Sequence, residues 1–234
     1  MLSLSELTFS YGSVHAVDHV SMEVTRGTVH GIIGPNGAGK STCIDLISGR
    51  QRPSSGAVHY AGEDITKRSV SWRRYAGISR SFQRISVFPE LTVADQLDLA
   101  GRALSEPDID VIVNALELAG TLNKFCSEIS YGEQRRVDIA LALMGEPSLV
   151  LLDEPAAGLS REESLQLADH LAALAKERES TFVLVEHDLE VVFRICDRLT
   201  VLEQGAVIAD GSPEDVRSEP AVIEAYLGRA GGSA

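Results

Sequence analysis

The stretch Gly34-Pro35-Asn36-Gly37-Ala38-Gly39-Lys40-Ser41-Thr42 decides which fold the sequence predicts. It fits the pattern G-x-x-x-x-G-K-[ST], follows the apolar run Gly31-Ile32-Ile33 and precedes an expected helix over Ser41–Ser48. Glycines let such a loop curve so that its N–H groups face phosphate oxygens, and the helix N-terminus adds a partial positive charge. Lys40 reaches the β- and γ-phosphates, and the Ser41 hydroxyl is a Mg²⁺ ligand. The stretch therefore predicts a nucleotide-phosphate site.

Three polar residues follow apolar strands further along the chain. The run Leu149–Leu152 ends in Asp153 and Glu154, and His187 comes shortly after the run Thr181–Val185. Asp153 suits Mg²⁺ positioning, while Glu154 is placed to polarise a water molecule for attack on a γ-phosphate. Because parallel strands end at the same edge of a sheet, we expect these side chains beside the phosphate loop.

The other segments predict an α/β fold with an inserted helical lobe. Strands are expected over Leu4–Phe9, Val14–Val24, Val29–Ile33, Ala57–Tyr60, Ala76–Phe82, Leu149–Leu152 and Thr181–Val185, with a hairpin of Leu199–Glu203 and Ala206–Ala209. Further helices are expected over Thr92–Leu104, Asp108–Ala119, Gly132–Met144, Arg161–Arg178 and Leu189–Cys196. Unbroken apolar strands are typical of a parallel sheet that is covered on both faces. We expect a single domain, with a core of residues 1–83 and 131–227, a helical lobe of residues 84–130 and a mobile tail of residues 228–234.

The charge balance disfavours two classes of partner. The 234 residues include 21 Lys and Arg against 34 Asp and Glu, which gives a net charge of −13 with histidine neutral. Nucleic acids and anionic membranes both bind basic surfaces, so a net charge of −13 disfavours them as partners. A local cluster of basic residues that includes Arg80 is the exception. The three cysteines are scattered and predict neither a disulfide framework nor a zinc site. The apolar runs are far shorter than the roughly 20 residues that cross a bilayer, and no secretory signal is visible. We therefore expect a soluble, cytoplasmic protein.

A third motif connects these features with a known family. The segment Ile129-Ser130-Tyr131-Gly132-Glu133-Gln134-Arg135-Arg136, called the signature segment below, lies between the phosphate loop and the acidic pair. It looks like the motif usually written LSGGQ, and from Tyr11 to Leu227 the chain resembles the ATP-binding subunits of ABC transporters. The resemblance implies a P-loop NTPase core of mostly parallel sheet, with an antiparallel β subdomain and an inserted small α-helical lobe. It also implies ATP and Mg²⁺ as cofactors and ATP hydrolysis as the activity.

The resemblance assigns roles to individual positions. Tyr11 matches an aromatic ring that stacks on adenine, Val17 a nearby apolar contact, and Gln83 a glutamine that senses Mg²⁺ and the attacking water. Nucleotide-binding positions are then Tyr11, Val17, Gly34, Pro35, Asn36, Gly37, Ala38, Gly39, Lys40, Ser41, Thr42, Ser130, Tyr131, Gly132 and Glu133. Catalytic positions are Lys40, Gln83, Glu154 as the general base and His187 as the γ-phosphate contact, and metal positions are Ser41, Gln83 and Asp153.

The resemblance also implies several partners. Ser130 and Gly132 match positions that contact the γ-phosphate of ATP held by a second ATPase subunit, identical or paralogous, and residues 157–160 match a loop that crosses the interface. Transmembrane permease subunits would dock near Gln83–Pro89, and a periplasmic or extracellular binding protein would act indirectly. This arrangement would hold the chain on the inner face of the cell membrane, and no nucleic-acid partner is expected.

Within the family, the sequence most resembles importers of branched-chain and other hydrophobic amino acids. The resemblance rests on residues 81–83 with 87–93, 130–136, 153–159 and 222–228. Tyr131 and Glu133 depart from the common signature but are familiar in this subgroup. Ser160 stands where Asp or Asn is usual, which would weaken coupling between two sites. Two alternatives stay open, a soluble ABC-type ATPase of an assembly system and the ATPase of a lipid or lipopolysaccharide exporter. The transported molecule is not specified, because substrate contacts belong to other subunits.

Overall fold

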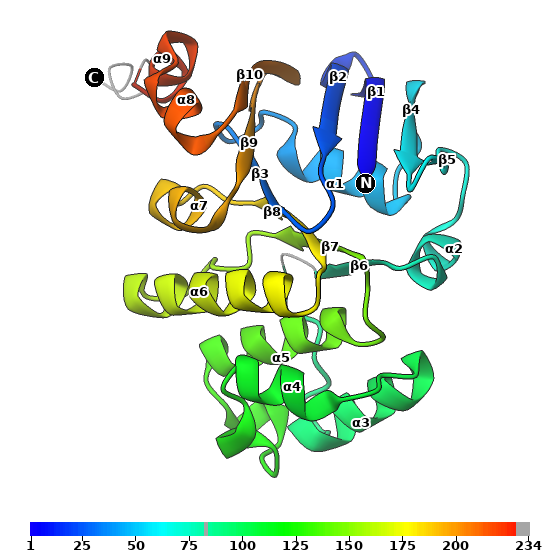
Figure 1. The fold of residues 1–234 in the computed structure, drawn as a ribbon, viewed down its shortest axis with the longest axis vertical. Coiled ribbons are helices and arrows are strands. Elements are labelled where there is room, and N and C mark those ends of the chain that lie inside the picture. The colour runs from blue at the N-terminus through cyan, green and yellow to red at the C-terminus, as the bar shows by residue number, and fades with distance from the viewer. Residues whose placement is uncertain (82–83, 228–234) are drawn as a thin grey trace.

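The computed structural model describes residues 1–81 and 84–227, in which two β-sheets organise the chain (Figure 1). The first sheet is antiparallel with the order β2-β1-β4-β5, and the second has the order β10-β9-β3-β8-β7-β6. The second sheet is parallel apart from the antiparallel pair β9 and β10. The strands span Leu2–Tyr11 (β1), Val14–Val24 (β2), Val29–Ile33 (β3), Ser55–Tyr60 (β4), Glu63–Asp64 (β5), Ile78–Ser81 (β6), Leu149–Asp153 (β7), Thr181–Val185 (β8), Arg198–Glu203 (β9) and Ala206–Gly211 (β10). The predicted fold class is confirmed.

Most of the helices lie within a few residues of their predicted positions. They span Lys40–Ser48 (α1), Val70–Tyr75 (α2), Val93–Leu104 (α3), Ile109–Ala115 (α4), Tyr131–Leu143 (α5), Arg161–Glu177 (α6), Leu189–Ile195 (α7), Pro213–Ser218 (α8) and Pro220–Leu227 (α9). The helix expected over Asp108–Ala119 ends at Ala115, because Glu117 takes a φ of 53° that no α-helix accommodates. The helices α2, α8 and α9 were not predicted, since six to eight residues show little periodicity and these helices do not follow a strand of the parallel core, as the equally short α7 does.

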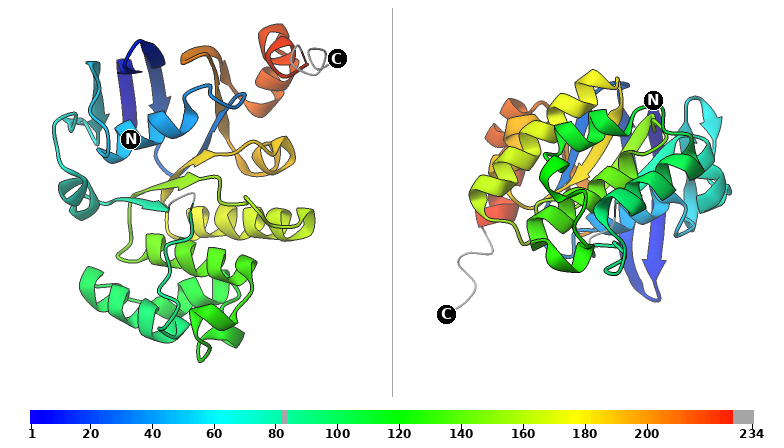
Figure 2. Two further views of the ribbon diagram at one scale, coloured as in Figure 1. Left: turned by 180° about the vertical axis from the view of Figure 1, so that it is seen from behind. Right: turned by 90° about the horizontal axis from the view of Figure 1, so that it is seen from below.

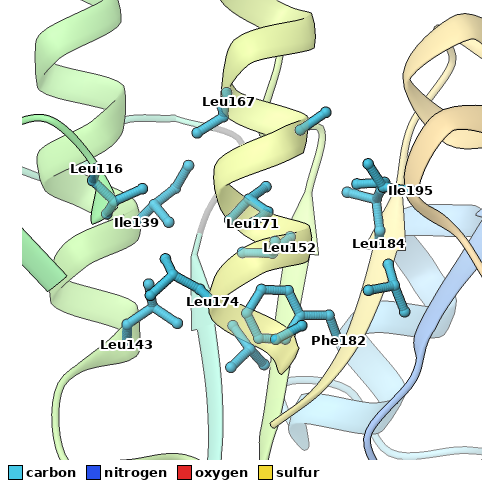
Figure 3. Packing of buried hydrophobic residues seen from close by; sticks show 14 of the residues in the cluster. Leu116, Ile139, Leu143, Leu152, Leu167, Leu171, Leu174, Phe182, Leu184 and Ile195 are labelled. Carbon is cyan, nitrogen blue, oxygen red and sulfur yellow. The ribbon is translucent and has the colours of Figure 1, made fainter. Parts of the chain in front are cut away.

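The parallel sheet is buried on both faces because helices and the other sheet cover it. Every residue of β7 and β8 is buried, and successive residues enter different hydrophobic clusters, as the period of two in a strand requires. Phe182 and Leu184 pack with Leu171 and other residues of α5 and α6 (Figure 3). Val183 and Val185 belong to the opposite cluster, with α1 and the antiparallel sheet. The sheet is thereby held rigid beneath the loops at its edge.

The segment between β6 and β7 carries α3, α4 and α5, which lie beyond α6 at one end of the molecule (Figures 1 and 2). Leu97 of α3 and Ile112 of α4 belong to the same continuous cluster as Leu152 of β7. The helical part therefore extends the core of the parallel sheet, and its boundaries at residues 84 and 130 stay a prediction. No helix among the described residues is both long and apolar enough to span a membrane. Gln83 and the tail of residues 228–234 lie outside the described residues.

Candidate active site

The phosphate loop joins β3 to α1, in the setting that the sequence predicts. Gly34 has a φ of 145° and Gly39 a φ of 100°, values that other residues rarely adopt. A Cβ atom at Gly34 would lie 2.0 Å from the Leu202 carbonyl oxygen, and one at Gly39 would lie 2.2 Å from the Ala16 carbonyl oxygen. Glycine is therefore required at both positions, where the loop passes against the main chain of β9 and β2.

Lys40, the first residue of α1, places its ammonium group over the loop. Its Nζ donates to the carbonyl oxygen of Gly34 at 2.7 Å and to that of Pro35 at 3.0 Å. Burial lowers the pKa of Lys40 from its usual value, while the carboxylates of Glu154 and Asp153 act in the opposite direction. A largely buried cation at a helix N-terminus fits the binding of a polyphosphate.

Two of the predicted metal ligands, Ser41 and Asp153, meet at the edge of the sheet. Ser41 Oγ donates to Asp153 Oδ1 at 3.1 Å. Burial raises the pKa of Asp153 above its usual value, and the Arg80 guanidinium is the largest of the influences that lower it. A hydroxyl and a buried carboxylate fit Mg²⁺, which prefers oxygen ligands and completes its shell with water and phosphate oxygens. Within the described ranges, no group of three or more His, Cys, Asp or Glu side chains forms a metal cluster.

Arg80, on β6, is a site residue that the sequence indicated only as part of a basic cluster and not as a partner of Asp153. Its guanidinium donates to Asp153 Oδ2 at 3.1 Å and to Asp45 Oδ1 at 2.6 Å. These partners lie 73 and 35 residues away in the sequence, so that no local pattern reveals the contacts. Arg80 therefore fixes the orientation of the Asp153 carboxylate from the side opposite Ser41.

Glu154 follows Asp153 in a left-handed backbone conformation, with a φ of 50°. Its N–H donates to the Val185 carbonyl oxygen at 2.8 Å, and its own carbonyl oxygen accepts from Arg135 Nη2 at 2.7 Å. These two bonds fix its main chain beside the end of β8. Its carboxylate is close enough to Lys40 to influence the lysine pKa. The predicted general base therefore lies at the expected edge, next to the phosphate loop.

His187 lies after β8 with its imidazole 59% exposed and Nδ1 3.7 Å from Glu186 Oε2. Glu186 is fully buried, and its two carboxylate oxygens accept from the N–H groups of Ala156 at 2.8 Å and of His187 at 3.1 Å. Burial raises the pKa of Glu186, and these backbone bonds lower it. Glu186 thus ties the loop after β7 to the loop after β8. Its only signal in the sequence was an acidic residue directly after an apolar strand.

The predicted adenine contacts lie in the antiparallel sheet. Tyr11 is 52% exposed, and its ring packs edge-on against Phe9 with the two ring centroids 4.9 Å apart. Val17 is paired with Phe9 across β1 and β2 and is completely buried. Tyr11 therefore has accessible ring surface, whereas Val17 lies in the core beside Phe9.

The signature segment forms the N-terminus of α5. Ser130 Oγ accepts from the Glu133 N–H at 3.2 Å, and Glu133 Oε2 accepts from the Ser130 N–H at 2.7 Å. The hydrogen bond from the Ser130 N–H is the main reason that the pKa of Glu133 lies below its usual value. Tyr131 is 49% exposed and covers Gly158, where a Cβ atom would lie 2.8 Å from Tyr131 Cε1. The structure therefore brings the signature segment together with the predicted interface loop at residues 157–160.

A cleft of about 890 Å³ connects the predicted magnesium ligands with the start of the helical part. Ser41 and Asp153 contribute to its lining, as do Arg84 and Ser86 from the segment after β6. The cleft is also lined by apolar side chains of α3 and α5, Leu104 and Leu141 among them. The space therefore extends from the phosphate loop towards the predicted permease-docking segment.

Phe88 and Pro89 are exposed in that segment, with 60% of the phenylalanine accessible. The buried side chain of Gln96 accepts from the Phe88 N–H at 2.8 Å and donates to its carbonyl oxygen at 3.1 Å. Because both main-chain groups of Phe88 are held from inside, its ring is presented outwards by a fixed backbone. Gln83, the other residue predicted here, lies outside the described part of the chain.

Comparison with known proteins places these features in a family. The family model "ABC transporter" matches residues 17–157, and "Branched-chain amino acid ATP-binding cassette transporter" matches residues 206–231. The chain is 34% identical to the high-affinity branched-chain amino acid transport ATP-binding protein LivG of Salmonella typhimurium, over 98% of each chain. It is similar to the ADP conformation of MJ1267, an ATP-binding cassette of an ABC transporter, with a TM-score of 0.87 and 31% identity over 97% of this chain and 98% of that one. It is also similar to the dimeric cassette MJ0796, with a TM-score of 0.80 and 25% identity over 91% and 99% of the two chains.

Proposed function

Because the chain belongs to the ABC transporter family, as its ATP-binding and ATP-hydrolysing cassette, we propose that it drives an importer of branched-chain or other hydrophobic amino acids. The proposal rests on one observation, which is that one edge of the sheet brings together Lys40, Ser41, Asp153 and Glu154. The likeness to LivG over 98% of both chains supports the choice of substrate class. The apolar nature of the substrate is proposed from that likeness alone, because transport specificity belongs to the permease and binding protein.

The hydrolysis is assigned to the residues at this edge. The phosphate loop and Lys40 bind the polyphosphate, and Glu154 orients a water molecule in line with the γ-phosphate and accepts its proton. His187 contacts the γ-phosphate and offsets the charge that develops on it. Ser41 and Asp153 would hold Mg²⁺, which would neutralise charge on the phosphate oxygens.

The second half of each ATP site is assigned to another cassette subunit. Ser130, Tyr131 and Gly132 stand at the exposed N-terminus of α5, where backbone N–H groups and the helix dipole favour an anion. Two chains would thus enclose two ATP molecules, each between the phosphate loop of one and the signature segment of the other. Loss of the γ-phosphate removes contacts from both chains at once and opens the pair.

Permease subunits are assigned to the cleft and to the exposed Phe88 and Pro89. A permease segment seated there would touch Arg84 and Ser86 and would lie next to Ser41 and Asp153, so that nucleotide state and permease position affect each other. Gln83 falls between β6 and this segment in the sequence and is assigned the sensing of Mg²⁺ and water. This docking would hold the chain at the cytoplasmic face of the membrane.

Replacement of Glu154 by Gln tests the chemical assignment. The amide cannot accept the proton of the attacking water, so turnover should fall by about two orders of magnitude or more while ATP affinity is retained. Glu177→Gln, at an exposed position in the last turn of α6, is the matched control and should keep normal turnover. Normal hydrolysis by Glu154→Gln would remove Glu154 from the role of base.

A mild-detergent pull-down from native membranes tests the transport assignment. Multi-span permeases and a second cassette subunit should be recovered with the tagged chain, and Phe88→Ala should reduce their recovery. Recovery of soluble proteins alone would support the assembly-type ATPase instead. Recovery of a lipopolysaccharide or lipid export permease would replace the amino-acid importer with an exporter.

A further inference from the structure

Arg135 is a fully buried cation that the nucleotide motifs leave without a function. It lies in the second turn of α5, and none of its side chain is accessible. A buried guanidinium is costly unless polar groups surround it, so its contacts specify what it holds. One of them is the carbonyl oxygen of Glu154, at 2.7 Å from Arg135 Nη2. A residue of the signature helix thus contacts the main chain of the proposed base.

The contacted peptide has an unusual geometry. Glu154 has a φ of 50°, and a left-handed conformation is unfavourable for a non-glycine residue unless its surroundings hold it. The Ala157 N–H donates to the same carbonyl oxygen at 3.1 Å, and the Glu154 N–H donates to Val185 at 2.8 Å. The φ and ψ angles of this residue set the direction in which its side chain leaves the main chain. Holding its carbonyl therefore helps to aim its carboxylate.

A second contact connects the same arginine with the docking segment. Arg135 Nη1 lies 3.8 Å from Asp138 Oδ2 on the next turn of α5. The other carboxylate oxygen, Asp138 Oδ1, accepts from the Ser86 N–H at 3.0 Å. Asp138 is itself 5% exposed, so this pair lies within the protein. Arg135 is therefore braced from the side away from Glu154.

We propose that Arg135 is a positioning residue for hydrolysis, which holds the Glu154 main chain in the left-handed conformation that directs its carboxylate towards the attacking water. This inference rests on the proposed role of Glu154 as the base. In this role Arg135 acts through the Glu154 main chain and not by contact with the nucleotide. We therefore expect loss of the guanidinium to lower kcat and to leave nucleotide affinity unchanged.

Arg135→Gln and Arg135→Lys in the full chain test the proposal by steady-state hydrolysis and by binding of a fluorescent ATP analogue. Arg135→Gln should lower kcat on the order of tenfold or more with KM and analogue affinity within about twofold of wild type. The kcat of Arg135→Lys, which keeps a cationic donor, should lie between that of Arg135→Gln and that of wild type. Arg178→Gln is the control, because Arg178 forms an ion pair with the buried Glu106 on a different part of the fold. It should lower the melting temperature without changing kcat.

A double-mutant cycle with Glu154→Gln separates this proposal from the proposed function. If Arg135 acts through Glu154, Arg135→Gln should cause no further loss of single-turnover rate in the Glu154→Gln chain. A further tenfold loss there, or a wild-type kcat for Arg135→Gln, would overturn the positioning role. Normal turnover by Glu154→Gln alone would instead overturn the proposed base. Should Arg135→Gln fail to fold, as judged by circular dichroism, Arg135→Lys decides in its place, and a wild-type kcat for it overturns the proposal.

Discussion

The phosphate-loop edge and the signature edge of this molecule are organised in opposite ways. At the phosphate-loop edge, called the first edge below, side chains from β6, β7 and α1 contact one another across long sequence distances, as Arg80 and Asp153 do. At the signature edge, called the second edge below, Ser130 and Glu133 each accept a hydrogen bond from the other's backbone N–H within one turn. Ser160 and Glu163 form the same reciprocal cap. The first edge is a network within one chain, whereas the second is a pair of capped, accessible helix ends.

This difference indicates how the two edges share the work. A network of buried charges such as Lys40 and Asp153 is preorganised, and it can bind and polarise a phosphate without large rearrangement. A capped helix end with exposed Ser130 and Tyr131 keeps its fold without a ligand and presents its surface to another molecule. We therefore expect the first edge to supply the chemistry and the second edge to complete the ATP site of another subunit.

Lys40→Met should produce the largest effect at the first edge. The substitution removes the cation that lies over Gly34 and Pro35, so ATP affinity and turnover should both fall by about 100-fold or more. Fluorescent-nucleotide titration and phosphate release measure the two quantities. Lys176→Met, in the exposed last turn of α6, controls for the loss of one positive charge. Wild-type ATP affinity in Lys40→Met would contradict the assignment of the first edge.

Ser130→Arg should leave the first edge intact and abolish the contact of the second edge with a partner subunit. A long cation at the helix N-terminus opposes the helix dipole and blocks the surface offered to a partner, so hydrolysis should fall by roughly 10- to 100-fold while ATP affinity of the single chain stays normal. Mixing this variant with Lys40→Met sharpens the test. A mixed pair would contain one site with a normal phosphate loop and a normal signature segment.

Hydrolysis should therefore reappear in the mixture of the two inactive variants, as measured by phosphate release at increasing total concentration. Each variant alone at the same concentration is the control. If the two edges served the same chain, no combination of these chains would contain an intact site. Light scattering shows whether the mixture forms pairs. A mixture that forms pairs and still does not hydrolyse ATP would contradict the division of work between the edges.

The two edges also differ in how far the sequence revealed them. The phosphate loop, Asp153 with Glu154, and the signature segment are each local in sequence, and a local pattern carries its own geometry because a strand end or a helix start is specified by neighbouring residues. Arg80 and Glu186 act through partners that lie distant in the sequence, and a single sequence contains no record of such contacts. The parallel core followed from apolar runs that are buried on both faces, whereas α2, α8 and α9 were too short for their periodicity to show.

His30 gives the first edge a sensitivity to acid that can be measured. It is buried in β3, beneath the phosphate loop, with Nε2 2.8 Å from Thr200 Oγ1. Burial lowers its pKa to about 4 from 6.5, while Asp210 raises it and Arg198 lowers it further. Between these two values the unfolded chain binds a proton that the folded chain excludes, so acid favours unfolding. This stability is complete above pH 6.5 and decreases as the pH falls towards 4, by at most about 3 kcal/mol.

Urea unfolding of wild type and His30→Val at pH 7 and pH 5 measures this contribution. The variant loses packing at both pH values, but its free energy of unfolding should fall less between pH 7 and pH 5 than that of wild type. The Thr200 hydroxyl keeps its bond to Asp210 at 2.6 Å, so the variant leaves no buried donor without a partner there. An equal fall in the two proteins would show that the buried imidazole is not the source of the acid sensitivity.

Ser160 gives the smallest expected effect and the closest test of the second edge. Its Oγ accepts from the Glu163 N–H at 3.3 Å and donates to Glu163 Oε2 at 2.7 Å, which caps α6. Ser160→Ala should cost about 1 kcal/mol, or a fall of roughly 2–4 °C in melting temperature. Ser212→Ala removes the same kind of cap from α8, which lies away from the signature segment, and is the matched control. An Asn side chain caps a helix as well as Ser does and keeps an amide donor for the Glu163 carboxylate, so Ser160→Asn should keep the melting temperature of wild type.

Measurement of ATP turnover then distinguishes a helix-capping role of Ser160 from a role in contacting a second cassette. If Ser160 also contacts a second cassette, Ser160→Ala should lower hydrolysis at subunit concentrations where pairing limits the rate, whereas Ser212→Ala should not. Ser160→Asn carries a residue that is usual in the family, and because it keeps the cap, any gain in cooperativity of hydrolysis would come from the interface itself. Equal turnover in all three variants would mean that this serine shapes the helix end without touching the partner, and that the second edge depends on Ser130 and Gly132 alone.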